Sequence, residues 1–131
     1  MHIAQFALTV REYDEAIAFF CKKLDFRLLE DTDMGGGKRW VRVQPPSPPS
    51  SAAACILLAR AATKEQIDSV GNQTGGRVFI FVHTDNIARD FDAYSGRGVR
   101  FVTQPRSEPY GKVAVFLDLY GNKWDLIEPA R

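Results

Sequence analysis

Histidine and cysteine are scarce in this chain, which has two of each among 131 residues. Cys21 and Cys55 lack the CxxC spacing of thiolate metal sites and lie in apolar stretches, so we expect two buried free thiols. A catalytic zinc takes about three His, Cys or carboxylate ligands. A non-haem iron takes two His and one carboxylate. With only His2 and His83 available, the composition argues against both kinds of site.

An excess of charge of one sign is also missing. The formal net charge is +1, and the Lys and Arg residues are scattered, so no basic patch for nucleic acid or an anionic membrane is expected. No apolar run approaches the roughly 20 residues of a membrane helix. The N-terminal residues 1–6 have the pattern of a strand rather than of a signal peptide. We therefore expect a cytoplasmic protein without nucleic-acid or membrane partners.

The length and the 45% hydrophobic content suit one domain, or two small half-domains that share a core. In the first half, apolar side chains from Tyr13 to Leu24 recur at helical spacing, whereas the segments around them alternate as strands do. Gly35–Gly37 predicts a hairpin turn rather than a phosphate loop, because a strand follows it. We expect strands at 3–10, 26–29, 39–43 and 55–58, and a helix at 12–24.

The same order recurs in the second half. A strand is expected at 78–82, a helix after an N-cap at Asp85, and a strand at 99–102. Two apolar runs on either side of Tyr120–Lys123 predict a final hairpin. Between the halves, Thr63–Gln66 fits a capping box that opens a short helix. The expected division is a first module at 1–62, a linker with a short helix at 63–76, and a second module at 77–131.

Prolines interrupt the first half at 45–51, where the chain cannot join a sheet and is expected to be an extended loop. This loop is either a plain connection or a lid over a binding cleft.

The end of the chain carries a recognisable motif, Phe116-x-Asp118-x-x-Gly121-Asn122-x-Trp124-Asp125-Leu126-x-Glu128-Pro129. With the opening 6–10 and 14–20, this arrangement resembles the vicinal oxygen chelate superfamily of glyoxalases, bleomycin and fosfomycin resistance proteins, and extradiol dioxygenases. The resemblance implies an α+β fold of two βαβββ modules whose curved sheets form a cleft. It also implies a homodimer, and leaves open whether modules pair within one chain or between chains.

Metal-using members of that superfamily take one ligand from each of four strands, usually His, Glu, His and Glu. Carried over by position, the four sites here are Gln5, Ile56 or Leu57, Val78 or Phe79, and Asp125. His2 has the wrong strand parity to share a face with Gln5, and His83 lies beside the loop that begins the second helix. The resemblance therefore predicts a cleft without the usual metal.

Asp125 is the strongest candidate for a functional residue. It lies in mid-strand between Trp124 and Leu126, so alternation points it to the opposite face, where a carboxylate needs water or partners. If that face is desolvated, the pKa of Asp125 rises and it can act as a base; beside Arg42 it stays ionised as an anchor. Trp124, Leu126, Phe79 and Phe81 are expected in the core under the helices. The expected ligand-binding residues are Gln5, Trp40, Arg42, Tyr110, Phe116 and Asp125.

The leading hypothesis is a protein that binds a small molecule without a metal, as bleomycin resistance proteins do. The alternative is a glyoxalase-like lyase or isomerase, or a dioxygenase, in which Asp125 and Gln5 complete a weak Mg²⁺ or Mn²⁺ shell. A metal-free enzyme with Asp125 as general base is a third hypothesis.

Overall fold

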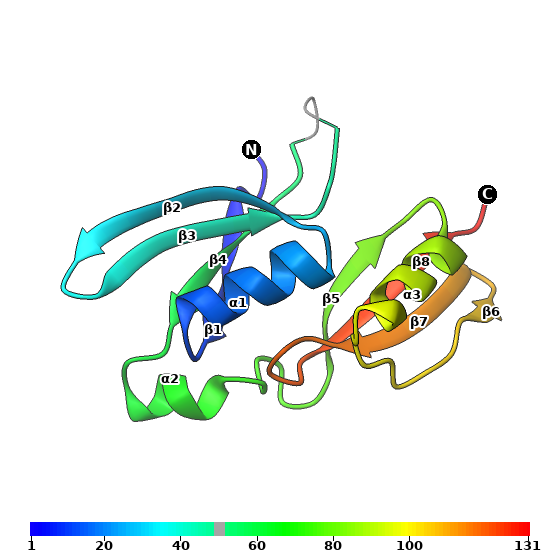
Figure 1. Cartoon of the computed structure of the whole chain (residues 1–131). Coiled ribbons are helices and arrows are strands. Elements are labelled where there is room, and N and C mark those ends of the chain that lie inside the picture. The colour runs from blue at the N-terminus through cyan, green and yellow to red at the C-terminus, as the bar shows by residue number, and fades with distance from the viewer. Residues whose placement is uncertain (49–51) are drawn as a thin grey trace. The chain divides into compact units, whose positions relative to one another are not determined.

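The computed structural model describes residues 1–48 and 52–131, and the chain divides into two compact units, 1–70 and 71–131. Each unit contains a four-stranded mixed sheet with helices (Figure 1). The predicted α+β class and the two βαβββ modules are confirmed. Of the proline-rich loop, residues 49–51 lie outside the described residues, and so does any role of that segment as a lid. None of the described helices is long and apolar enough to cross a membrane.

The first unit has its strands in the order β1-β4-β3-β2, with β1 and β4 parallel and the other neighbours antiparallel. The helix predicted at 12–24 begins as an α-helix and ends as a π-helical turn. The capping box at Thr63 is present, with the Gln66 N–H donating to the Thr63 hydroxyl. The elements are β1 (Gln5–Val10), α1 (Tyr13–Ala18), the π-helical η1 (Phe19–Lys23), β2 (Arg27–Gly35), β3 (Lys38–Gln44), β4 (Cys55–Arg60) and α2 (Lys64–Ser69).

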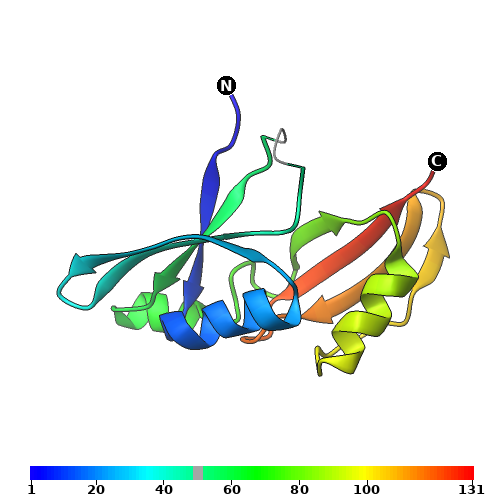
Figure 2. The same cartoon turned by 45° about the horizontal axis from the view of Figure 1, so that its top comes forward.

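The second unit repeats this arrangement as β5-β8-β7-β6, again with its first two strands parallel. Its elements are β5 (Val78–His83), α3 (Ile87–Gly96), β6 (Arg106–Glu108), β7 (Gly111–Leu117) and β8 (Lys123–Pro129). Figure 2 shows α3 lying across one face of this sheet. The shared strand order explains why the sequence pattern recurs.

Two local predictions in the second unit were wrong. The N-cap of α3 is Asn86 and not Asp85, because the Asn86 side chain accepts the Arg89 N–H. The strand expected at 99–102 reduces to one bridge between Phe101 and Phe116, and β6 takes its place at the sheet edge. The pairing stops there because the Val115 N–H donates to the Thr103 hydroxyl, at 2.8 Å, instead of to a neighbouring strand.

In the first unit, α1 and η1 cover one face of the sheet. Five apolar side chains on that face are fully buried, and they come from β1, β3 and β4. Phe20 at the end of the helix is also fully buried, and its ring centroid lies 5.5 Å from that of Phe26. Burial of large apolar side chains on one face of a sheet supplies most of the driving force for such a unit. The fully buried strand residues are Leu8, Val10, Val41, Val43 and Leu58.

The core of the second unit is aromatic. Phe116 stacks on Trp124 with ring centroids 5.6 Å apart, and Tyr94 of α3 lies edge-on to Phe116 at 5.5 Å. Trp124 and Leu126 are buried as predicted. The prediction for Phe81 was wrong, because β5 pairs Phe81 with Asp125 and leaves it 61% exposed. A bulge between Val78 and Ile80 shifts the alternation of β5, so its phase does not follow from simple counting.

The turn between β7 and β8 is built around one buried carboxyl group, that of Asp118. Its oxygens accept hydrogen bonds from the backbone N–H groups of Tyr120 and Asn122, from the Asn122 amide, and from the Trp124 indole, all at 2.9–3.1 Å. Asn122 in turn accepts the Gln73 N–H at 3.1 Å. Gly71 allows the segment that contains Gln73 to lie close to the turn, because a Cβ at position 71 would collide with the Tyr120 carbonyl oxygen. The motif residues therefore set the turn and the start of β8.

Replacing Asp118 should strongly destabilise the protein. D118A leaves the buried Trp124 indole N–H and the Asn122 amide without their acceptor, so we expect a loss of about 3 kcal/mol or more in unfolding free energy. D118N keeps one acceptor oxygen and should lose about 1–2 kcal/mol. Urea unfolding followed by tryptophan fluorescence measures both. Equal, small losses for the two variants would contradict this role.

Candidate functional site

Strand register decides which polar side chains meet in the first unit. Residues that pair across strands point to the same face, so Gln5 shares a face with its partner Cys55, and Arg42 shares one with Leu57 and Glu30. Leu57 is two residues from Cys55 on the same strand, which joins the two sets. All of them lie on the face away from α1. We call this the polar face of the first unit.

A continuous row of side chains crosses this polar face. The Arg42 guanidinium donates from Nε to Glu30 Oε1 at 3.1 Å and from Nη1 to Cys55 Sγ at 3.5 Å. The Cys55 thiol donates to Gln5 Oε1 at 3.7 Å. The hydrogen bond of Arg42 to Cys55, and to a lesser extent the one to Glu30, raises the pKa of Arg42, so the guanidinium stays positively charged. Each of the four strands contributes one side chain to the row.

Trp40 lies on the same face, because it is two residues before Arg42 on β3. It pairs with Thr32 of β2. The structure therefore brings together three of the predicted ligand-binding residues, Gln5, Trp40 and Arg42. It also separates the two alternatives for the next metal-ligand position. Leu57 is on the polar face, whereas Ile56 points into the core and is buried.

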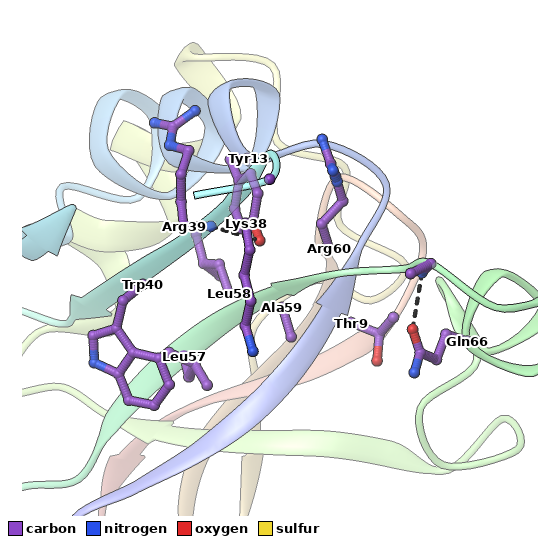
Figure 3. A pocket seen from close by; sticks show the side chains of 12 residues that line it. Thr9, Tyr13, Lys38, Arg39, Trp40, Leu57, Leu58, Ala59, Arg60 and Gln66 are labelled. Carbon is purple, nitrogen blue, oxygen red and sulfur yellow. Dashed lines mark hydrogen bonds between the residues drawn. The ribbon is translucent and has the colours of Figure 1, made fainter. Parts of the chain in front are cut away.

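Next to Trp40 the sheet opens. β3 pairs with β4 only over Val41–Val43, so Lys38, Arg39 and Trp40 lie apart from the end of β4. The Arg39 N–H is satisfied instead by the Tyr13 hydroxyl of α1, at 3.1 Å. The Tyr13 side chain thus replaces the strand that would otherwise accept this N–H, and the Arg39 N–H is not left without a hydrogen bond. The separation leaves a pocket of about 510 Å³ (Figure 3).

In the second unit, Asp125 points away from Trp124, as predicted. It pairs with Val115 on one side and Phe81 on the other, which defines the polar face of this unit. Desolvation by partial burial raises the pKa of Asp125, and the positive charge of Arg106 on β6 opposes the rise. Arg106 is itself paired with Glu108 at 2.8 Å.

Two further predicted residues do not meet as expected. Phe116 was expected beside Asp125, but the antiparallel register aligns it with Trp124, so it is buried on the opposite face. Tyr110 follows β6 in the turn before β7 and is 53% exposed. It therefore lies in a turn at the end of the sheet and not on a strand beside Asp125.

The described residues contain no group of three His, Cys, Asp or Glu side chains close enough to hold a metal ion. His83 ends β5 opposite Ile127 and is exposed. His2 precedes β1 and is exposed, so the expected parity argument does not apply to it. Cys21 and Cys55 are free thiols; Cys55 is buried and Cys21 only partly so.

The model of the Glyoxalase/Bleomycin resistance protein/Dioxygenase superfamily matches residues 2–126. The chain belongs to this superfamily. An uncharacterized protein of Shewanella frigidimarina is 51% identical over 127 residues, which cover 96% of this chain and 92% of the relative. The crystal structure of UcmS2 matches with a TM-score of 0.83 at 24% identity, covering 98% of both chains. TnmS3, an antibiotic binding protein from Streptomyces sp. CB03234, matches with a TM-score of 0.77 at 24% identity, covering 99% of this chain and 97% of TnmS3.

Membership of the superfamily did not identify every residue of the site. Sequence reasoning missed Glu30 and treated Cys55 only as a buried thiol, although both belong to the row on the polar face. Strand parity around Gln5 and Arg42 could have suggested them. It could not supply the register, because the paired strands are far apart in the sequence.

Removing the charge of Arg106 should raise the pKa of Asp125 further. Among the described residues Arg106 is the cation whose charge lowers this pKa, so R106Q leaves desolvation unopposed. The side-chain carboxyl ¹³C shift of Asp125 followed against pH by NMR gives the value. R131Q is the matched control, since the charge of Arg131 acts on Asp85. An unchanged or lowered pKa in R106Q would show that this interaction is absent.

D125N should change how stability depends on pH. Because the folded-state pKa of Asp125 is raised above 3.8, the folded protein holds this proton to higher pH than the unfolded chain. Its contribution to stability is therefore complete at about pH 3 and is lost as pH rises through the folded-state pKa. D125N removes that loss, so relative to wild type it should gain stability between about pH 3 and pH 7. Urea unfolding at both values tests this; a constant difference would refute it.

Proposed function

We propose that this chain binds a small organic molecule on the polar face of its first unit, without a metal ion. The observation that carries the proposal is the row Gln5–Cys55–Arg42–Glu30 beside the indole of Trp40. Small-molecule sites combine flat apolar walls with a few positioned polar groups. Trp40 and Leu57 supply the first, and the row supplies the second.

The charge of this face supports metal-free binding. Of the positions that correspond to metal ligands in the superfamily, Gln5 offers an amide and Leu57 offers no donor. Arg42 places a permanent positive charge within hydrogen-bond distance of Cys55 and Glu30, so a divalent cation on this face would be repelled and would lose its best oxygen ligand to Arg42. A neutral or anionic polar ligand suits the guanidinium better.

Proteins of similar structure support a role in binding small molecules, without indicating which molecule is bound. TnmS3 is an antibiotic binding protein and shares the fold of this chain over nearly its whole length. At 24% identity the likeness concerns the fold, so the identity of the ligand follows only from the side chains of this chain.

One observation favours an enzymatic alternative. The raised pKa of Asp125 is the property of a carboxylate that accepts a proton during catalysis. In a metal-dependent glyoxalase-like lyase or isomerase, or a dioxygenase, Asp125 would instead be a deprotonated oxygen ligand for Mg²⁺ or Mn²⁺, together with Gln5. Such an enzyme would require added metal, whereas a binding protein would not.

A fragment screen by NMR tests the proposed site. A set of aromatic amides, alcohols and acids is added to ¹⁵N-labelled protein in EDTA, and bound fragments should shift the Trp40 indole and Gln5 amide signals. W40A should weaken the hits about tenfold, because the flat apolar wall is lost. I67A removes an equally apolar, 58% exposed side chain from α2 and should leave binding unchanged.

Elemental analysis of the purified protein decides between the two functions. Retention of one divalent ion per chain, with ligand binding lost in EDTA, would overturn the metal-free proposal in favour of the enzymatic alternative. Fragment hits that shift no signal on the polar face of the first unit would overturn the assignment of the site.

A further inference from the structure

The pocket between the separated ends of β3 and β4 has a distinctive charge. Three cationic side chains line it, Lys38, Arg39 and Arg60, and no carboxylate is among its described lining residues. Its volume of about 510 Å³ is in the range of small-molecule sites. Trp40, Leu57 and Ala59 of the polar face form its apolar side, so it continues the face described above.

The three cations are not equivalent. Arg39 is saturated, since its guanidinium makes two hydrogen bonds to Asp31, at 3.0 and 2.7 Å, and one to Asp14 at 2.8 Å. Figure 3 shows it directed away from the pocket. Its charge is therefore neutralised locally, and it serves to hold the hairpin against α1.

Arg60 has a looser partner. Its closest carboxylate oxygen is that of Glu12 at 3.7 Å, on a side chain that is 59% exposed. The guanidinium carbon lies 5.4 Å from the centroid of the Tyr13 ring, which holds it at the rim without consuming its hydrogen-bond donors. Arg60 pairs with the buried Val10, so it points to the α1 face and away from the polar face on which Trp40 and Lys38 lie.

Lys38 is the free charge. Within the described chain its ammonium has no hydrogen-bond or ion-pair partner, and Lys38 is exposed where it lines the pocket. Figure 3 shows it running into the pocket, with Trp40 on one side and Thr9 and Gln66 on the other. An ammonium beside an apolar wall offers its three donors to an anion that enters next to the indole.

We propose that this pocket selects a planar, apolar molecule that carries an anionic group, with the ring on Trp40 and Leu57 and the anion at Lys38. This rests on the proposed function, because the ring occupies the same polar face. It adds the class of ligand, an aromatic carboxylate or a similar organic anion. Gln66 closes the rim, where its Oε1 accepts the Ala62 N–H at 2.8 Å, and so leaves no acceptor aimed at the anion.

Paired probes test this selectivity. Naphthalene-2-carboxylate and 2-naphthamide have the same ring and differ in charge, and benzoate and benzamide form a smaller pair. The Trp40 indole N–H signal reports binding, and the Trp124 indole, held by Asp118 in the core, is an internal control. We expect the carboxylates to bind about three- to tenfold more tightly than the amides, with the preference falling as salt is added.

Variants locate the charge. K38Q should remove most of the preference for the carboxylate and leave amide binding unchanged, and K38E should reverse the preference. K22Q, which removes an exposed lysine of η1, is the matched control and should behave as wild type. Equal binding of acid and amide to wild type, or a K38Q variant that keeps the preference, would overturn the inference.

The outcomes also separate this inference from the proposed function. If neutral fragments shift Trp40 and Gln5 but neither acid of the two pairs is preferred, the polar face binds ligands and only the charge selectivity is wrong. If no fragment and no probe shifts those signals, both proposals fail.

Discussion

The hydrogen bonds to the Asp118 carboxyl group set the register on which the second unit depends. One side chain holds two backbone N–H groups of the turn and the indole of Trp124, so the turn and the first buried residue of β8 are determined together. Because side chains alternate along a strand, a slip of one residue would turn Trp124 out of the core and Asp125 into it. The motif at 116–129, which carries the resemblance to the superfamily, therefore serves first to hold the fold. The position of Asp125 follows from it.

Register has the same consequence in the first unit. Parallel pairing of β1 with β4 places Gln5 beside Cys55, and antiparallel pairing of β3 places Arg42 next to them. Four residues that are far apart in the sequence thus form one hydrogen-bonded row. The row contains a guanidinium at its centre, and this supports a ligand that accepts hydrogen bonds over one that is a divalent cation. The expected homodimer stays a prediction that rests on the resemblance.

The pocket depends on a hydrogen bond between a helix and a strand. A side chain of α1 accepts a backbone N–H of β3 that a neighbouring strand would otherwise accept. The Tyr13 hydroxyl satisfies the Arg39 N–H, so β3 can leave β4 without exposing an unpaired backbone group to the interior. Carboxylates from β2 and α1 pair with Arg39, whereas the neighbouring Lys38 has no carboxylate partner among the described residues. The local arrangement explains why one of two adjacent cations holds the fold, and it is the reason we propose the other as the site of the ligand's anionic group.

The sequence by itself determined the two modules, the final hairpin and the burial of Trp124 and Leu126, because these follow from short-range periodicity and turn residues. It also placed Asp125 on the opposite face. Only the tertiary structure decided that Phe116 is aligned with Trp124, that a bulge exposes Phe81, and that a Thr103 side chain ends the pairing at Phe101. Sequence reasoning named Gln5 and Arg42 as candidates, but their connection through Cys55 and the contribution of Glu30 came only from the structure. Local sequence specifies that a strand forms and which of its faces is apolar, whereas the register between distant strands is settled by packing and turns elsewhere in the chain.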